Sequence, residues 1–179
     1  MAREQAIQTL QALFETSCME LFEGLHCVVN RSAPPEFDMN EVPTACIDAG
    51  SAQLEVFVIM RLPLTVLALT YPDHEQLITT VDEEKLEDWI SELCNQLIGR
   101  FKNRLIPFGC VMLLGLPNCY FGTDINELLP IGYEHFVFHF ETDGEIFECR
   151  ISINLIDDNL SLDSAAEDDG AGEGELELF

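Results

Sequence analysis

The sequence predicts an α+β fold, in which an N-terminal helix and a second, long helix pack on an antiparallel-rich β-sheet. Residues 80–105 repeat apolar side chains at helical spacing, which indicates an amphipathic helix. Residues 53–60 form a β-branched, strongly apolar run that is typical of a buried central strand. Asp143 and Gly144 stand between two alternating runs, which is the pattern of a type I′ hairpin. Helices combined with hairpin-linked strands favour an antiparallel sheet with the helices on one face.

The first half of the chain predicts a helix, two strands and a short helix. Residues 4–26 place apolar side chains at helical spacing, so we expect an amphipathic helix there. Residues 44–49 predict a short strand, which a turn joins to the central strand over residues 53–60. Pro63 suits the first turn of a short helix over residues 64–70, because that turn leaves its N–H groups unpaired in any case.

The long helix over residues 80–105 carries the functional interpretation. Thr80, followed three residues later by Glu83, is a capping-box start. The apolar stripe consists of Leu86, Trp89, Ile90, Leu93, Leu97, Ile98, Phe101 and Leu105. Four other positions follow each other at spacings of four, three and four, and therefore stack on the opposite face: Asp88, Glu92, Asn95 and Gly99.

The last part of the chain predicts a strand and a hairpin. Residues 110–116 form an apolar run that we expect to be a strand, ended by Pro117 and Asn118. The two-residue loop at Asp143 and Gly144 fixes the register of the hairpin. The pairs expected on its core face are Thr142 with Glu145, Phe140 with Phe147, Phe138 with Cys149, and Phe136 with Ile151.

The charge is strongly negative, with 33 acidic and eight basic residues and a net charge of -25. Nucleic acid and an anionic membrane surface are therefore excluded as partners. Residues 156–179 hold nine acids and no base, so we expect a folded domain over residues 1–155 and a disordered acidic tail after it. The tail ends in Leu-Glu-Leu-Phe, either a short docking motif or simply part of a solvating tail. With no apolar run of about 18 residues and a polar N-terminus, a cytoplasmic protein is expected.

Metal and covalent chemistry find no support in the sequence. None of the seven cysteines forms a C-x-x-C pair, and we expect buried free thiols. His135 and His139 share one strand face roughly 13 Å apart, too far for joint ligation of a metal. We expect His139 to pair with Glu148 across the hairpin instead. Because no phosphate-binding, hydrolase or zinc motif is present, the polar face of the long helix is the remaining candidate site.

That polar face has two interpretations, a solvated helix surface or a site kept open for a partner. Asn95 has only a middling helix propensity, and Gly99 costs roughly 1 kcal/mol relative to alanine in a helix interior. Exposed glutamate and lysine would be the more stable choice at these positions, which favours a binding site. Pro117 follows Asn95 after 21 intervening residues.

These residues resemble the signature of the CheC, CheX and FliY phosphatases, which dephosphorylate the chemotaxis response regulator CheY. The signature is Asp or Ser, three residues, Glu, two residues, Asn, and a proline slightly more than twenty residues later. Here it is Asp88, Glu92, Asn95 and Pro117. The resemblance covers roughly residues 5–155. One copy of the motif resembles CheX more than CheC and implies a homodimer.

The resemblance also implies a role for each residue. Asn95 would position the water that attacks the phosphoaspartate of a CheY-like response regulator, and Glu92 would pair with a lysine of that partner. Asp88 and Pro117 would support the site, and Gly99, from its size alone, would allow close approach. The chain would need no cofactor of its own, because the Mg²⁺ belongs to the partner's phosphorylation site. The alternative is a non-catalytic dimerisation or adaptor module in chemotaxis or two-component signalling.

Overall fold

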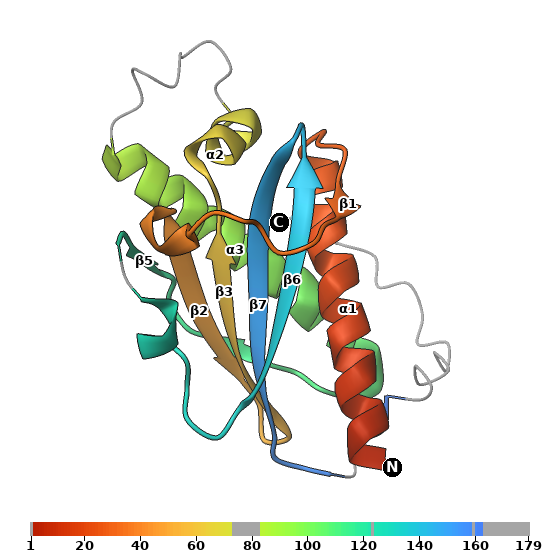
Figure 1. Cartoon of the computed structure of the whole chain (residues 1–179). Coiled ribbons are helices and arrows are strands. Elements are labelled where there is room, and N and C mark those ends of the chain that lie inside the picture. Colours follow the sequence, from red (N-terminus) through yellow and green to blue (C-terminus); the bar gives the residue numbers. More distant parts are fainter. Residues whose placement is uncertain (1, 73–82, 123, 159, 163–179) are drawn as a thin grey trace, which may run out of the picture.

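The computed structural model describes residues 2–72, 83–122, 124–158 and 160–162. Its α-helices are α1 (Ala2–Gly24), α2 (Leu64–Thr70) and α3 (Glu83–Leu105), and its short 3-10 helices are η1 (Met39–Glu41), η3 (Ile106–Phe108) and η4 (Ile125–Glu127). Its strands are β1 (Asn30–Arg31), β2 (Thr44–Gly50), β3 (Leu54–Arg61), β4 (Leu113–Leu114), β5 (Asn118–Tyr120), β6 (Glu134–Thr142) and β7 (Glu145–Leu155). The strands form one antiparallel sheet in the order β1-β6-β7-β3-β2-β4, with β5 also paired to β2. The helices cover one face of this sheet (Figure 1), which confirms the predicted α+β fold.

Strand β3 is central, as its apolar sequence predicts. It pairs along its length with β2 on one side and with β7 on the other, so that Met60 lies between Ala45 and Cys149. From Val58 to Arg61 its side chains are buried on both faces of the sheet. The predicted hairpin is also confirmed, because β6 and β7 pair Phe140 with Phe147 in the expected register.

The turn of this hairpin has the backbone conformation that the sequence predicts. The φ angles are 49° at Asp143 and 81° at Gly144, and both central residues of a type I′ turn require positive φ. Glycine adopts this conformation without steric cost, and aspartate tolerates it better than most residues. Local turn chemistry therefore sets the register of the two longest strands.

The single strand predicted over residues 110–116 is wrong. Strand β4 covers only Leu113 and Leu114, and β5 resumes at Asn118, beyond the proline that was expected to end the strand. Between the two paired segments the edge uses one residue more than β2, which makes a bulge. Pro117 has no N–H to donate and lies in this bulge.

A close backbone approach fixes the edge beside the bulge. The Gly115 amide donates to the Asp48 carbonyl at 2.8 Å. A Cβ atom at position 115 would lie 2.3 Å from Oδ1 of the same aspartate, so a side chain there would force the exposed Asp48 carboxylate to turn away. The apolar run is therefore an interrupted edge strand, and several of its side chains face solvent.

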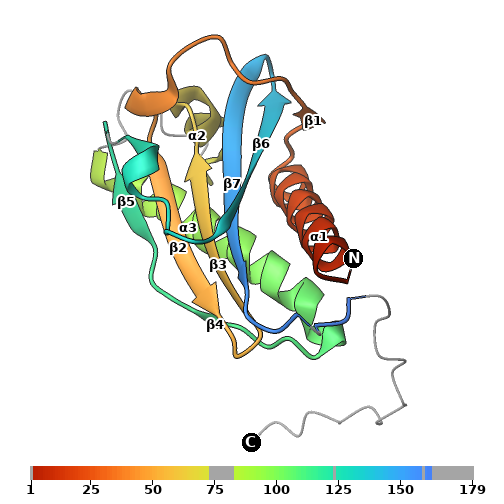
Figure 2. The same cartoon turned by 60° about the horizontal axis from the view of Figure 1, so that its bottom comes forward.

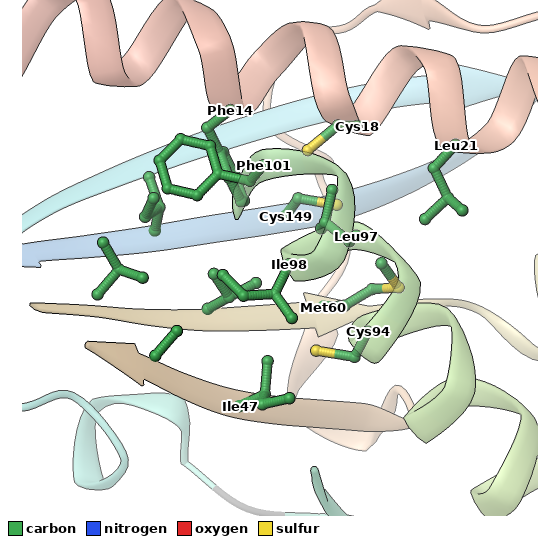
Figure 3. Close-up of a cluster of buried hydrophobic side chains, with 14 of the residues drawn as sticks. Phe14, Cys18, Leu21, Ile47, Met60, Cys94, Leu97, Ile98, Phe101 and Cys149 are labelled. Carbon is green, nitrogen blue, oxygen red and sulfur yellow. The ribbon is translucent and has the colours of Figure 1, made fainter. Parts of the chain in front are cut away.

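The core lies between the sheet and the pair α1 and α3 (Figure 2). Figure 3 shows Phe14 and Phe101 meeting between the two helices, with ring centroids 5.8 Å apart and an edge-on angle of 82°. The predicted apolar stripe of α3 is confirmed, because six of its eight residues are fully buried and the other two are partly buried. The proposed cap at Thr80 lies outside the described residues.

The cysteines are free thiols, and five of the seven are buried. Cys18, Cys94 and Cys149 gather within the core (Figure 3), and burial raises the pKa of Cys18 and Cys94 well above the usual range. Burial also raises the pKa of Cys46 and Cys119 to about 11. These thiols are protonated at neutral pH, so they are poor nucleophiles and poor metal ligands.

The opposite face of the sheet carries a charged cluster. Nε2 of His139 lies 3.1 Å from Oε2 of Glu148, which confirms the predicted pair. Arg150 donates to the other carboxylate oxygen at 2.6 Å, and buried Arg61 approaches it at 3.5 Å. His135 instead hydrogen-bonds the hydroxyl of Ser152. The two histidines therefore have different partners.

After β7 the chain turns back toward α1. The Ile156 amide donates to the Gln53 carbonyl at 2.9 Å, and Arg3 pairs with Asp158 at 2.6 Å. Leu160 and Leu162 are buried in the main core, so packing continues into the segment expected to be a tail. Among the described residues, no helix is long and apolar enough to span a membrane.

Candidate functional site

Helix α3 presents one polar face away from the sheet. Its apolar side packs on β2 and β3 and contacts α1, which fixes the rotation of the helix. Asp88 and Glu92 are exposed on the outward side, and Asn95 and Gly99 are partly exposed. The structure therefore brings these four predicted residues together along about three turns of a rigid element.

Glu92 is held along the helix by its neighbour one turn later. Nε2 of Gln96 donates to Oε1 of Glu92 at 2.9 Å, a contact that spacing of four residues favours. The hydrogen bond orients an exposed carboxylate without burying it. Glu92 therefore presents a negative charge to solvent in a defined position.

Asn95 lies one turn after Glu92 and has an available amide. Within the described part of the chain its side chain makes no hydrogen bond, so one acceptor and two donors face outward. Its backbone is fixed because the preceding residue, Cys94, is fully buried against β2. At Gly99 an added Cβ would meet nothing within 4 Å, so glycine leaves open space rather than filling a tight contact.

A shallow hollow that the sequence did not reveal adjoins Asp88 and Glu92. It is lined by Tyr71, Pro72, Lys85, Asp88, Trp89 and Glu92. The Trp89 indole donates to the Thr70 hydroxyl at 3.1 Å, and the Tyr71 ring packs edge-on against it at 5.9 Å. The end of α2 is thereby anchored to α3, and the hollow has an aromatic wall beside two carboxylates.

Pro117 lies on a different element from the other four residues. It is part of the bulge between β4 and β5, and β5 contacts the side of α3. Glu87 of α3 acts on the thiol of Cys119 in β5, where it adds to burial in raising the pKa to about 11. The described contacts bring this edge next to α3 but do not join Pro117 to Glu92 or Asn95.

The comparisons with known proteins decide the fold. No family profile and no curated protein sequence matches the chain. CheX from Vibrio vulnificus superposes with a TM-score of 0.64 at 13% identity, covering 82% of this chain and 99% of that one. CheX from Desulfovibrio desulfuricans gives 0.63 at 10% identity, with the same coverage. CheX from Borrelia burgdorferi, solved with CheY, BeF3 and Mg²⁺, gives 0.61 at 18% identity and covers 80% and 96%.

The chain has a CheX-like fold. In this CheX-like fold the polar face of α3 stands clear of the sheet, where another protein can approach it. Within the described residues there is no group of three or more His, Cys, Asp or Glu side chains that could hold a metal ion. The face offers a fixed carboxylate and an available amide, a combination suited to binding and to orienting water rather than to covalent chemistry.

Proposed function

We propose that this chain accelerates hydrolysis of the phosphoaspartate on a CheY-like response regulator. One observation carries the proposal: Glu92 and the available amide of Asn95 stand one turn apart on the outward face of a firmly packed helix. The fold adds support, because a solved structure of similar fold is a CheX bound to CheY. The deciding measurement is phosphate release from phosphorylated receiver domains, with Asn95→Ala as the variant.

The chemistry of a phosphoaspartate suits this small set of groups. An acyl phosphate is already activated, so the reaction needs an aligned water more than a strong base. The amide of Asn95 would orient the water by hydrogen bonding without ionising. The water attacks phosphorus, the bond to the aspartyl oxygen breaks, and a carboxylate and inorganic phosphate result. The Mg²⁺ belongs to the response regulator and offsets the charge on the phosphoryl oxygens there.

Glu92 would hold the partner through a lysine beside the phosphoryl group. We expect Glu92→Gln to weaken the complex about 10-fold, or ~1.4 kcal/mol, because it removes the charge and keeps the shape. Fluorescence titration against a receiver domain carrying BeF3 measures this loss. Glu36→Gln, at an exposed acid in the segment between β1 and β2, is the matched control. Equal affinity of Glu92→Gln and the unaltered chain would contradict the ion pair.

The remaining predicted residues would support binding. Asp88 lines the hollow beside Trp89, where a side chain of the partner would fit. Gly99 would let the partner approach the helix backbone. Pro117 would shape the neighbouring edge, since the bulge that contains it borders α3.

We also propose a homodimer, for which the exposed edge of the sheet offers an apolar surface. Val111, Leu113 and Leu116 are 63%, 79% and 82% exposed along β4 and its flanks. Leu113→Glu combined with Leu116→Glu should shift sedimentation from dimer to monomer, because it places charge in an apolar contact. Ile131→Glu, at a fully exposed position elsewhere, should leave the dimer intact. If the variant with both Leu113→Glu and Leu116→Glu still forms a dimer, the dimer interface lies on another surface.

This exposed edge also favours the second candidate function, a non-catalytic adaptor. An adaptor would bind the receiver and dimerise without accelerating phosphate loss. Receiver binding, combined with identical phosphate loss in the presence and absence of the chain, would establish the adaptor in place of the phosphatase.

A further inference from the structure

Two basic residues at the end of α3 lack carboxylate partners within the described part of the chain. Arg100 is exposed and Lys102 is partly exposed, and neither forms an ion pair there, although acids outnumber bases 33 to eight. The other arginines, Arg3, Arg31, Arg61, Arg104 and Arg150, each pair with a carboxylate. The negative end of the helix dipole accounts for basic residues at this place. Arg100 lies before that last turn, and its Nη2 is 3.5 Å from the position that a Cβ at Gly24, the end of α1, would take. Neither cation has a carboxylate partner among the described residues.

The two cations border a strip of α3 that contains no acid of its own; the neighbouring acid Glu20 of α1 pairs with Arg104. At 3.6 residues per turn, Gly99 and Asn103 lie between Arg100 and Lys102 on the outward side of the helix. Residues 96–105 contain no acid. An added Cβ at Gly99 would meet nothing within 4 Å, so the centre of the strip is open to a second chain segment. A segment that crosses the helix here passes both cations.

The acidic end of the chain has the complementary charge. Residues 163–179 contain seven acids and no base: Asp163, Glu167, Asp168, Asp169, Glu173, Glu175 and Glu177. They follow Leu162, which is buried in the same cluster as Phe101 and Leu105 of α3. Figures 1 and 2 show this blue segment beside the green C-terminal end of α3. The tail therefore starts next to the cationic strip.

The tail is also long enough to cover the strip. Seventeen residues reach up to about 55 Å when extended, whereas α3 measures about 15 Å from Leu105 back to Asn95. A short tether holds the carboxylates at roughly millimolar effective concentration. An external anion has no such advantage, because the net charge of -25 opposes its approach. The negative charge of the tail and its covalent tether to the chain both favour the tail as the segment that binds this strip of α3.

We propose that the acidic tail, residues 163–179, docks across the last turns of α3 with its carboxylates on Arg100 and Lys102. The docking goes beyond the proposed phosphatase activity and holds without it. A docked tail borders Gly99 and Asn95, so it competes with a receiver domain for the polar face; this consequence rests on the proposed function. The tail then acts as a tethered competitor that only a tightly binding partner displaces.

Carbodiimide coupling tests the docking in the full-length chain, because the sequence contains only two lysines, Lys85 and Lys102. The reagent joins a lysine amine to a carboxylate in contact with it, and mass spectrometry identifies the pair. We expect Lys102 to join tail carboxylates at least about 5-fold more than Lys85 does in 0.05 M salt. The yield should fall at least about 5-fold in 1 M salt, where the Debye length is about 3 Å.

Arg100→Glu is the decisive variant, because it leaves Lys102 and every tail carboxylate in place. It should lower the coupling of Lys102 to the tail at least about 3-fold. Arg31→Glu makes the same charge change on β1 and should leave the coupling unchanged. Equal coupling of the two lysines, or no loss in Arg100→Glu, overturns the proposal. The proposal is also overturned if Lys102 couples only to the tail of a second chain. A mixture of ¹⁴N- and ¹⁵N-labelled chains reveals such intermolecular coupling.

Competition is measured by exchanging the seven tail acids for Asn or Gln. Affinity for a BeF3-loaded receiver should rise at least about 3-fold, and an unchanged affinity overturns the competition. A chain without phosphatase activity that still shows salt-sensitive coupling at Lys102 overturns the proposed function and upholds the docking. The measurements therefore distinguish a failure of the tail docking from a failure of the proposed phosphatase function.

Discussion

Asn95→Ala is expected to lower the acceleration of phosphate loss from a phosphorylated receiver domain at least about 100-fold, or ~2.7 kcal/mol of transition-state stabilisation. The amide is the group that would hold the attacking water, and the methyl group of alanine offers neither donor nor acceptor. Binding should change little, since Glu92 and the hollow beside Trp89 remain. Release of inorganic phosphate from a receiver phosphorylated by a small-molecule donor measures the rate.

The fold should survive this change, which makes the result interpretable. Asn95 is partly exposed and has no side-chain hydrogen bond among the described residues, and alanine is the better helix former. The melting temperature should therefore stay the same or rise slightly. Asn126→Ala, an exposed asparagine on another element, is the control and should keep full activity. If Asn95→Ala is as active as the control, Asn95 is not the catalytic residue.

Phe101→Ala is expected to lower the free energy of unfolding by about 3–5 kcal/mol, the usual cost of emptying a large buried site. The ring is fully buried and meets the Phe14 ring edge-on at 5.8 Å, so it joins α1 to α3 above the sheet. Small domains have only about 5–15 kcal/mol of stability in total. Equilibrium denaturation in urea measures the loss.

An exposed phenylalanine provides the comparison for Phe101. Phe37 lies on the surface, and Phe37→Ala should change the free energy of unfolding by less than about 0.5 kcal/mol. A loss below about 1 kcal/mol for Phe101→Ala would show that the helices hold together by other contacts. The activity of Phe101→Ala should fall with the folded fraction, because the residue supports the polar face from behind.

The elements that the sequence predicted correctly are those specified by local chemistry. The hairpin register follows from two residues at positive φ, Asp143 and Gly144. Helix α3 follows from a long apolar period that no strand could satisfy. The strand over residues 110–116 failed because apolar composition says nothing about a partner strand. Its break depends on a close approach between Gly115 and Asp48, residues far apart in the chain.

In the candidate site too, the sequence predicted what local spacing determines and missed what depends on tertiary packing. Helical spacing alone placed Asp88, Glu92, Asn95 and Gly99 on one face. The hollow beside them escaped prediction, because Tyr71 follows the end of α2 and reaches Trp89 only through tertiary packing. Leu160 and Leu162 were hidden by the acidic composition around them, although both are buried in the core. Composition describes a segment on average, whereas burial is decided residue by residue.

The central position of β3 has a consequence for how the protein is made. Its pairing with β2 is local, but its pairing with β7 joins segments about 90 residues apart. During synthesis the first hairpin emerges from the ribosome long before β7 exists, and one edge of β3 stays open while the middle of the chain is translated. The open edge presents unpaired backbone groups, and the same strand carries Val56, Val58 and Met60 on its core face, so nascent-chain chaperones would recognise it as an apolar strand. The sheet closes only when the last strand has been delivered.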